Sequence, residues 1–189
     1  ASSGVLLALL SAGCESPGFR AAKAQSEERW QAARAKVKAQ LAADQLESGN
    51  ITAAAVELAE ATRQDPDNQE LIPLRAKVHL AAGELNQAQR ALESGYGPDS
   101  SPEIDYLLGV VWQQRERWDA ALECFERAAR KAPREVAYAT AYAQTLTQRG
   151  HAADARDWLI NVAHELAYTA AYQATLGEAY EALGDNKSA

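Results

Sequence analysis

Apolar and small residues recur at helical spacing along most of the chain. Within residues 105–133, two groups of such residues each lie along one helix face, with a short polar break between the groups: Leu108, Gly109 and Trp112, then Ala121, Phe125 and Ala128. Runs of β-branched residues, which strands prefer, are almost absent. The pattern therefore predicts an all-α protein built from pairs of short helices.

The helix pairs are predicted to repeat at a fixed period. Glycines that follow about a dozen helix-forming residues lie at Gly49, Gly83, Gly150 and Gly184, at intervals of 34, 67 and 34 residues. The long interval holds two units, and Glu116 stands where the missing glycine would be expected. Since glycine commonly ends a helix, each of these positions predicts a tight turn between two helices.

Small residues stand wherever the two helices of a unit are expected to cross. Two helices approach closely only where the facing side chains are small, and in this register every facing position is Ala or Gly. The pairs are Ala42 with Ala54, Ala76 with Ala88, Gly109 with Ala121, Ala143 with Ala155, and Gly177 with Ala189.

A period of 34 residues with this pattern resembles the tetratricopeptide repeat (TPR) family. The match lies in "LGVVW" at 108–112, in Ala121 with Phe125, and in Pro133, whereas Asp105 departs from the tryptophan that the family prefers. The resemblance implies a right-handed superhelical solenoid of antiparallel helix pairs, with about four and a half repeats.

The predicted array occupies residues 26–189. It divides into an N-terminal helix at 26–34 and repeats at 35–68, 69–101, 102–135, 136–169 and, in part, 170–189. One long helix over 26–48, starting at Ser26, is expected to cap the N-terminal end, and the second helix of the second repeat is expected to end near Ser94. The last repeat stops before a second helix, so we expect the natural chain to continue past residue 189.

The composition gives little support to catalysis or to nucleic-acid binding. The net charge is -7, and a general nucleic-acid binder needs a basic face. His79 is expected to lie in the core, Cys124 to be a small buried hydrophobe, and every carboxylate to face solvent. We therefore predict no enzyme activity, no cofactor, no metal, no nucleic acid and no small-molecule substrate.

The resemblance implies a binding groove on the concave side, lined by the first helix of each repeat. The residues that would line it are Leu46, Lys77, Leu80, Glu103, Tyr106, Val110, Gln113, Gln114, Ala137, Thr140, Gln144, Thr147, Gln148, Glu178 and Glu181. These predict a neutral groove for an extended or helical protein segment, with use of other faces as the alternative. One TPR subgroup grips chaperone tails with Lys and Asn, but Ala39, Ala43, Pro73 and Lys77 stand there, so chaperone-tail binding is not expected.

The N-terminal residues are predicted to be a targeting signal and not part of the fold. Residues 1–13 are uncharged and too short to span a bilayer, and "LLSAGC" at 9–14 resembles a bacterial lipoprotein signal in which Cys14 receives lipid. Ser11 departs from the leucine that such signals prefer. The alternative is the apolar tail of a cytosolic protein.

A tether over 14–25, kept non-helical by Pro17 and Gly18, is expected after the signal-like segment. Residues 19–40 hold six cations and two anions, a local charge of +4, so the remainder sums to -11. This basic segment is interpreted either as a solvated helix face or as a cationic stem near anionic lipid headgroups.

The leading hypothesis is a non-catalytic TPR scaffold, anchored by lipid in the bacterial cell envelope and facing the periplasm, that binds a protein segment in its groove. A soluble cytosolic TPR adaptor and a regulatory array fused to an enzyme domain beyond residue 189 are the alternatives.

Overall fold

The computed structural model of the protein describes residues 16–167 and 169–184. Three predictions fall outside these residues: the signal-like segment 1–13, the lipid attachment at Cys14, and the pairing of Gly177 with Ala189. Within the described part, no helix is both long enough and apolar enough to cross a membrane.

The described residues form helices joined by short turns and contain no strand. The helices are α1 Pro17–Glu47, α2 Ile51–Gln64, α3 Leu71–Ala81, α4 Leu85–Glu93, α5 Pro102–Gln114, α6 Trp118–Lys131, α7 Val136–Gln148, α8 Ala152–Leu166 and α9 Ala170–Ala182. The all-α solenoid predicted from the sequence is therefore confirmed. The second helix of the second unit, α4, ends at Glu93 with Ser94 as its C-cap, as expected.

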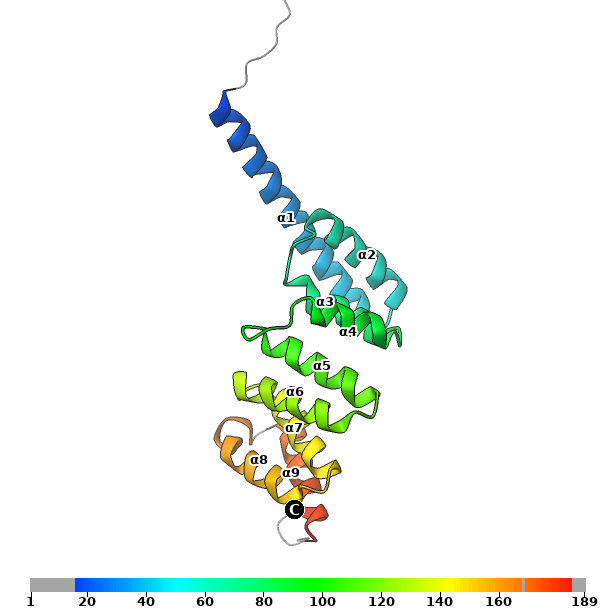
Figure 1. The fold of residues 1–189 in the computed structure, drawn as a ribbon, viewed down its shortest axis with the longest axis vertical. Helices are drawn as coiled ribbons and strands as arrows, with labels where there is room; N and C mark the ends of the chain where they lie inside the picture. Colours follow the sequence, from blue (N-terminus) through cyan, green and yellow to red (C-terminus); the bar gives the residue numbers. More distant parts are fainter. Residues whose placement is uncertain (1–15, 168, 185–189) are drawn as a thin grey trace, which may run out of the picture.

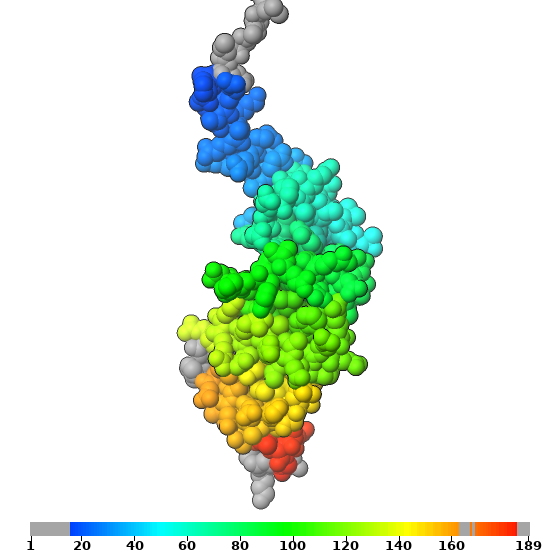
Figure 2. All heavy atoms as spheres, in the orientation of Figure 1, coloured from blue at the N-terminus to red at the C-terminus, as the bar shows by residue number. Residues whose placement is uncertain are grey.

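The helices stack into an elongated array of pairs (Figure 1). Each predicted repeat from 35–68 to 136–169 contains two helices, which pack against each other as α1·α2, α3·α4, α5·α6 and α7·α8. The first half of α1 extends beyond this array as a single helix at one end of the molecule (Figures 1 and 2).

The turns within the pairs share one backbone geometry. The residue at the turn has a positive φ: 77° at Gly49, 75° at Gly83, 83° at Gly150 and 59° at Glu116. In each turn the next N–H donates to a carbonyl five residues back, as from Arg117 to Trp112 O at 2.9 Å. This 6→1 bond ends a helix in the left-handed conformation that suits glycine. Glu116 therefore occupies a glycine position, as its spacing indicated.

Substitution of Glu116 by glycine is expected to stabilise the protein by about 0.5–1 kcal/mol. A side chain in the left-handed region costs about 1–2 kcal/mol, and the greater freedom of glycine in the unfolded chain offsets part of that gain. Gly150→Ala, the same change in reverse one repeat later, should destabilise by a similar amount. Urea denaturation followed by circular dichroism measures both, and a loss of stability in Glu116→Gly would contradict the turn geometry.

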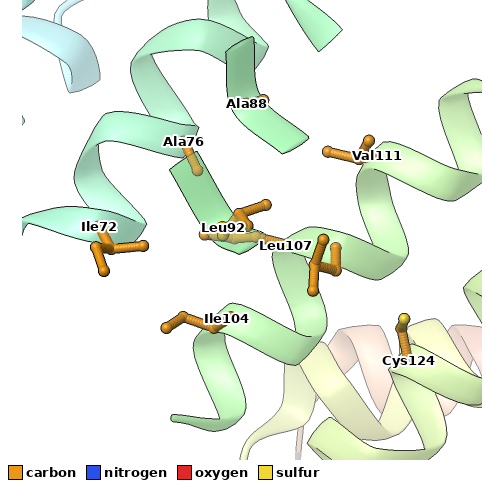
Figure 3. Packing of buried hydrophobic residues seen from close by; sticks show 9 residues of the cluster. Ile72, Ala76, Ala88, Leu92, Ile104, Leu107, Val111 and Cys124 are labelled. Carbon is orange, nitrogen blue, oxygen red and sulfur yellow. The ribbon is translucent and has the colours of Figure 1, made fainter. Parts of the chain in front are cut away.

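Small residues lie at the helix crossings as the pattern predicted. Ala42, Ala54, Ala76, Ala88, Ala121, Ala143 and Ala155 are each fully buried. Larger apolar side chains fill the space between successive pairs. In Figure 3, Leu92 of α4 lies between Ile72 and Ala76 of α3 on one side and Ile104 and Leu107 of α5 on the other.

Helix α1 begins earlier than the sequence indicated. It starts at Pro17 rather than at Ser26, and the Ser16 hydroxyl accepts a hydrogen bond from the N–H of Phe19 at 3.2 Å. The predicted non-helical tether is therefore wrong from Pro17 onward. The reason is that proline blocks a helix interior but favours the first helical position, where its missing N–H has no helical partner.

His79 is not the core imidazole that its position predicted. Its side chain is 28% exposed, and its Nδ1 lies 2.7 Å from the Glu84 carboxylate across the α3–α4 turn. The helix face was assigned correctly, but the ring lies near the end of α3, where the turn leaves room for water and for Glu84.

Cys124 is buried, as predicted, with 5% of its surface exposed. Burial raises the pKa of its thiol, outweighing the nearby Arg127, which acts to lower it. The reactive thiolate is therefore scarce at neutral pH. In a Cys14→Ser variant, we expect the Cys124 thiol to react with an aromatic disulfide reagent only as fast as the protein opens, and at once in denaturant. Immediate reaction in the native state would contradict this.

Candidate functional site

The first helices of successive units contact one another through side chains on one side of the array. Lys77 of α3 pairs with Glu103 of α5 at 2.5 Å, and Gln144 of α7 donates to the hydroxyl of Thr175 on α9 at 3.3 Å. We call the side of the first helices that carries Lys77, Glu103 and Gln144 the first-helix face. These side chains also hold neighbouring repeats to each other.

The N-terminal half of this face is hollowed. A cavity of about 280 Å³ lies between α1, α3 and α5, and a cavity of about 670 Å³ lies between α3, the start of α5 and the loop 94–101. Both are lined by Glu70, Pro73 and Glu103, so the two cavities adjoin, and we call them together the α3–α5 hollow.

The α3–α5 hollow is charged, whereas the sequence predicted a neutral groove. Glu70, Asp99 and Glu103 line the part beside the loop, and Lys36 and Lys77 line the part beside α1. The Lys77–Glu103 pair crosses the hollow with side chains 46% and 37% exposed, so water and salt weaken it. A ligand carrying charge of its own can therefore compete for either group.

Asp105 corrects the expectation that every carboxylate faces solvent. It is fully buried on α5 and accepts hydrogen bonds from two cations of α6, from Arg127 Nε to Oδ1 at 3.0 Å and from Lys131 Nζ to Oδ2 at 2.7 Å. Burial acts to lower the pKa of the Arg127 guanidinium, but the hydrogen bond with Asp105 and the charge interactions with Cys124, Tyr96 and Asp105 together outweigh it, and the pKa is raised. Asp105 stands where the family prefers tryptophan, so an ion-pair cluster replaces an apolar contact between α5 and α6.

The Asp105 cluster also fixes the loop that borders the α3–α5 hollow. Lys131 Nζ donates to the Ser100 carbonyl at 2.8 Å, and the Arg127 guanidinium lies over the Tyr96 ring at 5.4 Å. Gly95 packs so closely against Ile72 that a Cβ there would lie 2.6 Å from the Ile72 side chain. The loop 94–101, which forms one rim of the hollow, is therefore held by its contacts with Lys131 and Arg127 of the Asp105 cluster and by the packing of Gly95 against Ile72.

Aromatic rings continue the first-helix face beyond the hollow. Tyr106 of α5 lies 5.6 Å from Phe125 of α6 and 5.0 Å from Tyr138 of α7, measured between ring centroids. Burial raises the pKa of both tyrosines, against a lowering effect of Lys77 at Tyr106 and with added repulsion from Glu103 at Tyr138. Both phenols therefore stay neutral at physiological pH and offer an apolar face with a polar edge.

The predicted groove residues differ in how much surface they offer. Those exposed are Lys77, Gln114, Gln148 and Glu178, and those half-buried are Leu46, Leu80, Tyr106, Val110, Gln113 and Gln144. Thr140 is 7% exposed, and its hydroxyl donates to the Val136 carbonyl at 2.8 Å. Thr140 therefore offers almost no surface to a ligand.

Sequence reasoning did not identify three contributors: Glu70, Asp99 and Tyr138. Asp99 lies in a Gly- and Pro-rich segment that was interpreted only as a helix exit. A loop of that length between two helices of an otherwise tightly spaced array is itself an indication of a functional rim.

Within residues 16–167 and 169–184, no group of three or more His, Cys, Asp or Glu side chains could hold a metal ion. The most deeply buried carboxylate, Asp105, is neutralised by two cations and does not face the hollow.

Comparisons with known proteins agree with this architecture. Residues 45–109 match the family model described as "Tetratricopeptide repeat". None of the curated proteins compared with the chain matches it.

Several solved structures share the fold. The MamA protein is 20% identical, with a TM-score of 0.63 over 82% of this chain and 85% of its own. A structure described as a functional characterisation of Pseudomonas aeruginosa pilF is 16% identical, with a TM-score of 0.72 over 82% and 71%. TTC0263, a thermophilic TPR protein in Thermus thermophilus, is 19% identical, with a TM-score of 0.63 over 80% and 84%.

These identities are low enough that the likeness concerns the fold alone. Residues 45–109 thus match the tetratricopeptide repeat family model, and the described chain has the all-α solenoid fold of tetratricopeptide-repeat proteins.

Proposed function

We propose that the protein is a non-catalytic scaffold that binds a segment of another protein along its first-helix face, beginning in the α3–α5 hollow. The observation that carries this proposal is the hollow itself, two adjoining cavities that extend from α1 to the loop 94–101. Its floor comes from helices and its rim from a fixed loop, so it is largely preformed, which lowers the entropic cost of binding.

The lining indicates the chemistry of the segment. Glu70 and Asp99 beside the loop favour a Lys or Arg side chain, and Tyr106 with Tyr138 beyond them favours an apolar or aromatic residue. An extended segment with a basic residue followed by an apolar one fits this order along the face.

We further propose that the mature protein begins at Cys14 and is anchored by lipid in the bacterial cell envelope, facing the periplasm. The support is the likeness of residues 9–14 to a lipoprotein signal. The early start of α1 at Pro17 would leave only two residues between the lipid and the helix. Helix α1 would then follow the lipid anchor almost directly, without a flexible tether between them.

Site-specific photocrosslinking tests the binding face. A photoreactive amino acid at Asp99 or Gln114, both exposed on the proposed face, is expected to capture a discrete partner in the native organism. The same amino acid at Arg130 of α6 or Ile160 of α8, exposed on second helices, is the matched control. Capture from the control positions alone would place binding on another face and refute the proposal.

Metabolic labelling with a fatty-acid analogue tests the anchor. The wild-type protein is expected to carry label and to sediment with membranes, whereas Cys14→Ser should carry none. Cys124 needs no separate control, because its burial keeps it from acyl donors. An unlabelled wild-type protein would remove the anchored model and leave the cytosolic adaptor.

A further inference from the structure

Helix α1 carries a row of exposed apolar side chains that no other part of the described chain covers. Phe19, Trp30, Val37 and Leu41 are 56%, 60%, 69% and 37% exposed. At 3.6 residues per turn they fall within about 40° of one another around the helix. We call this row the α1 stripe.

The α1 stripe faces away from the repeat array. The side of α1 that packs on α2 is marked by Ala35 and Ala42, both fully buried. At 100° per residue these two lie more than about 100° away from the stripe. The stripe also begins on the part of α1 that extends past the array (Figures 1 and 2), where no second helix pairs with it.

Basic residues border the α1 stripe on one side. Helical spacing places Lys23 and Arg34 within about 20° of the edge marked by Leu41, and both are exposed. Arg29, on the same part of α1, is also exposed. Glu27 and Glu28 are the acidic residues of this segment, so residues 19–40 keep a net charge of +4 while the remainder of the chain sums to -11. The chain therefore has one basic end, and that end carries the exposed apolar row.

We propose that α1 lies in the plane of an anionic membrane surface, with the α1 stripe inserted among the headgroups. An apolar row that includes Trp and Phe, beside an edge of Lys and Arg on a segment of net positive charge, is the pattern of a helix that binds at a lipid–water interface. Each basic side chain near an anionic surface adds an electrostatic attraction to it. The acidic remainder is repelled by the same surface, so the repeats stand away from it with the first-helix face accessible.

The charge of residues 19–40 favours an anionic membrane surface over a second copy of the chain as the partner of the α1 stripe. Two copies that paired through the α1 stripe would bring one segment of charge +4 against another. An anionic lipid surface complements that charge, and it accommodates a single row of apolar side chains without a matching groove. The proposal requires no acyl group, so it stands independently of the anchor at Cys14.

Vesicle co-sedimentation of the full chain with Cys14→Ser tests the proposal, because no lipid is then attached. We expect binding to phosphatidylcholine vesicles containing about one third phosphatidylglycerol, little binding to phosphatidylcholine alone, and loss of binding in high salt. Trp30→Glu with Val37→Glu should weaken binding to the anionic vesicles by about tenfold or more, with the helical circular dichroism unchanged.

Matched controls are available on the repeats. Val56→Glu on α2 and Ile160→Glu on α8 replace apolar side chains that are 58% and 50% exposed, and neither should change vesicle binding. In the Cys14→Ser chain, quenching of the Trp30 fluorescence by brominated lipid, obtained as the difference from Trp30→Phe, should report insertion.

Equal vesicle binding by the Trp30→Glu, Val37→Glu variant would overturn the proposal. So would a concentration-dependent dimer in sedimentation that this variant abolishes, since the stripe would then bind a second copy. Photocrosslinking at Asp99 and Gln114 does not depend on vesicle binding. The two experiments therefore distinguish a failure of the proposed membrane binding from a failure of the proposed partner binding.

Discussion

Asp105→Asn is expected to destabilise the protein by about 2–3 kcal/mol. Removing one partner of a buried ion pair costs about 3–5 kcal/mol, because the remaining charge is left without compensation. The cost here is lower because the Arg127 and Lys131 side chains are 36% and 30% exposed and regain some water. Urea denaturation gives the change in the free energy of unfolding.

The same variant should loosen the loop 94–101. Lys131, released from Asp105, keeps only its bonds to Ser100, and Arg127 loses the partner that holds it beside Tyr96. Amide hydrogen exchange in residues 95–101 should therefore rise more than exchange in α7, and capture from Asp99 should fall.

Lys77→Met is the control for the Asp105 prediction. It breaks an ion pair of similar length, Lys77–Glu103, whose groups are exposed, and should cost no more than about 1 kcal/mol. Equal losses in Asp105→Asn and Lys77→Met would show that burial of Asp105 contributes nothing.

The sequence predicted the repeat architecture well because each repeat is specified locally. The helix crossings need small residues and the turns need a left-handed residue, and both needs recur every 34 residues. The pattern was regular enough to mark Glu116 as a glycine position, and its φ of 59° agrees. Phe125, part of the family's second-helix pattern, is buried, and so is Cys124, which was expected to be buried because a lone cysteine on a packed helix usually is.

The misassigned features depend on partners far along the chain or on position within a helix. Asp105 was expected to face solvent because its own helix gives no sign of Arg127 and Lys131, which lie 22 and 26 residues later. Those two cations are spaced four apart on α6, so they share a face, but only the α5·α6 packing aims that face at Asp105. Pro17 was taken as a helix breaker because its role changes at the first turn.

The sequence predicted that the first helices carry the candidate site, but it did not predict the α3–α5 hollow. The resemblance to the TPR family implied that Tyr106, Gln114 and Gln148 face the groove from the first helices, because the family's groove positions recur in each repeat. The α3–α5 hollow depends on how the loop 94–101 folds back against α3, and that is set by tertiary contacts such as Gly95 against Ile72. A neutral groove was expected because Glu70 and Asp99 lie outside the repeat positions considered.

Two glycines at the same repeat position should respond to alanine with opposite sign. In Gly109→Ala, the new Cβ would lie 2.5 Å from the Phe125 ring, which is 1% exposed and packed against Tyr106. The ring cannot move away without displacing the core between α5 and α6, so we expect a loss of about 1–3 kcal/mol. In Gly177→Ala, the Cβ meets no atom of the described residues within 4 Å, and the better helix propensity of alanine should add up to about 1 kcal/mol.

The comparison separates packing from propensity, since both positions are glycines inside a helix. Thermal denaturation of the two variants in parallel, with Gly109→Ala combined with Phe125→Leu as a third, gives the measurement. The smaller leucine should recover part of the loss in Gly109→Ala if the Phe125 ring is the cause. Stabilisation by Gly109→Ala would contradict the close approach of α5 and α6 at this crossing. The same need for small residues is expected at every described crossing.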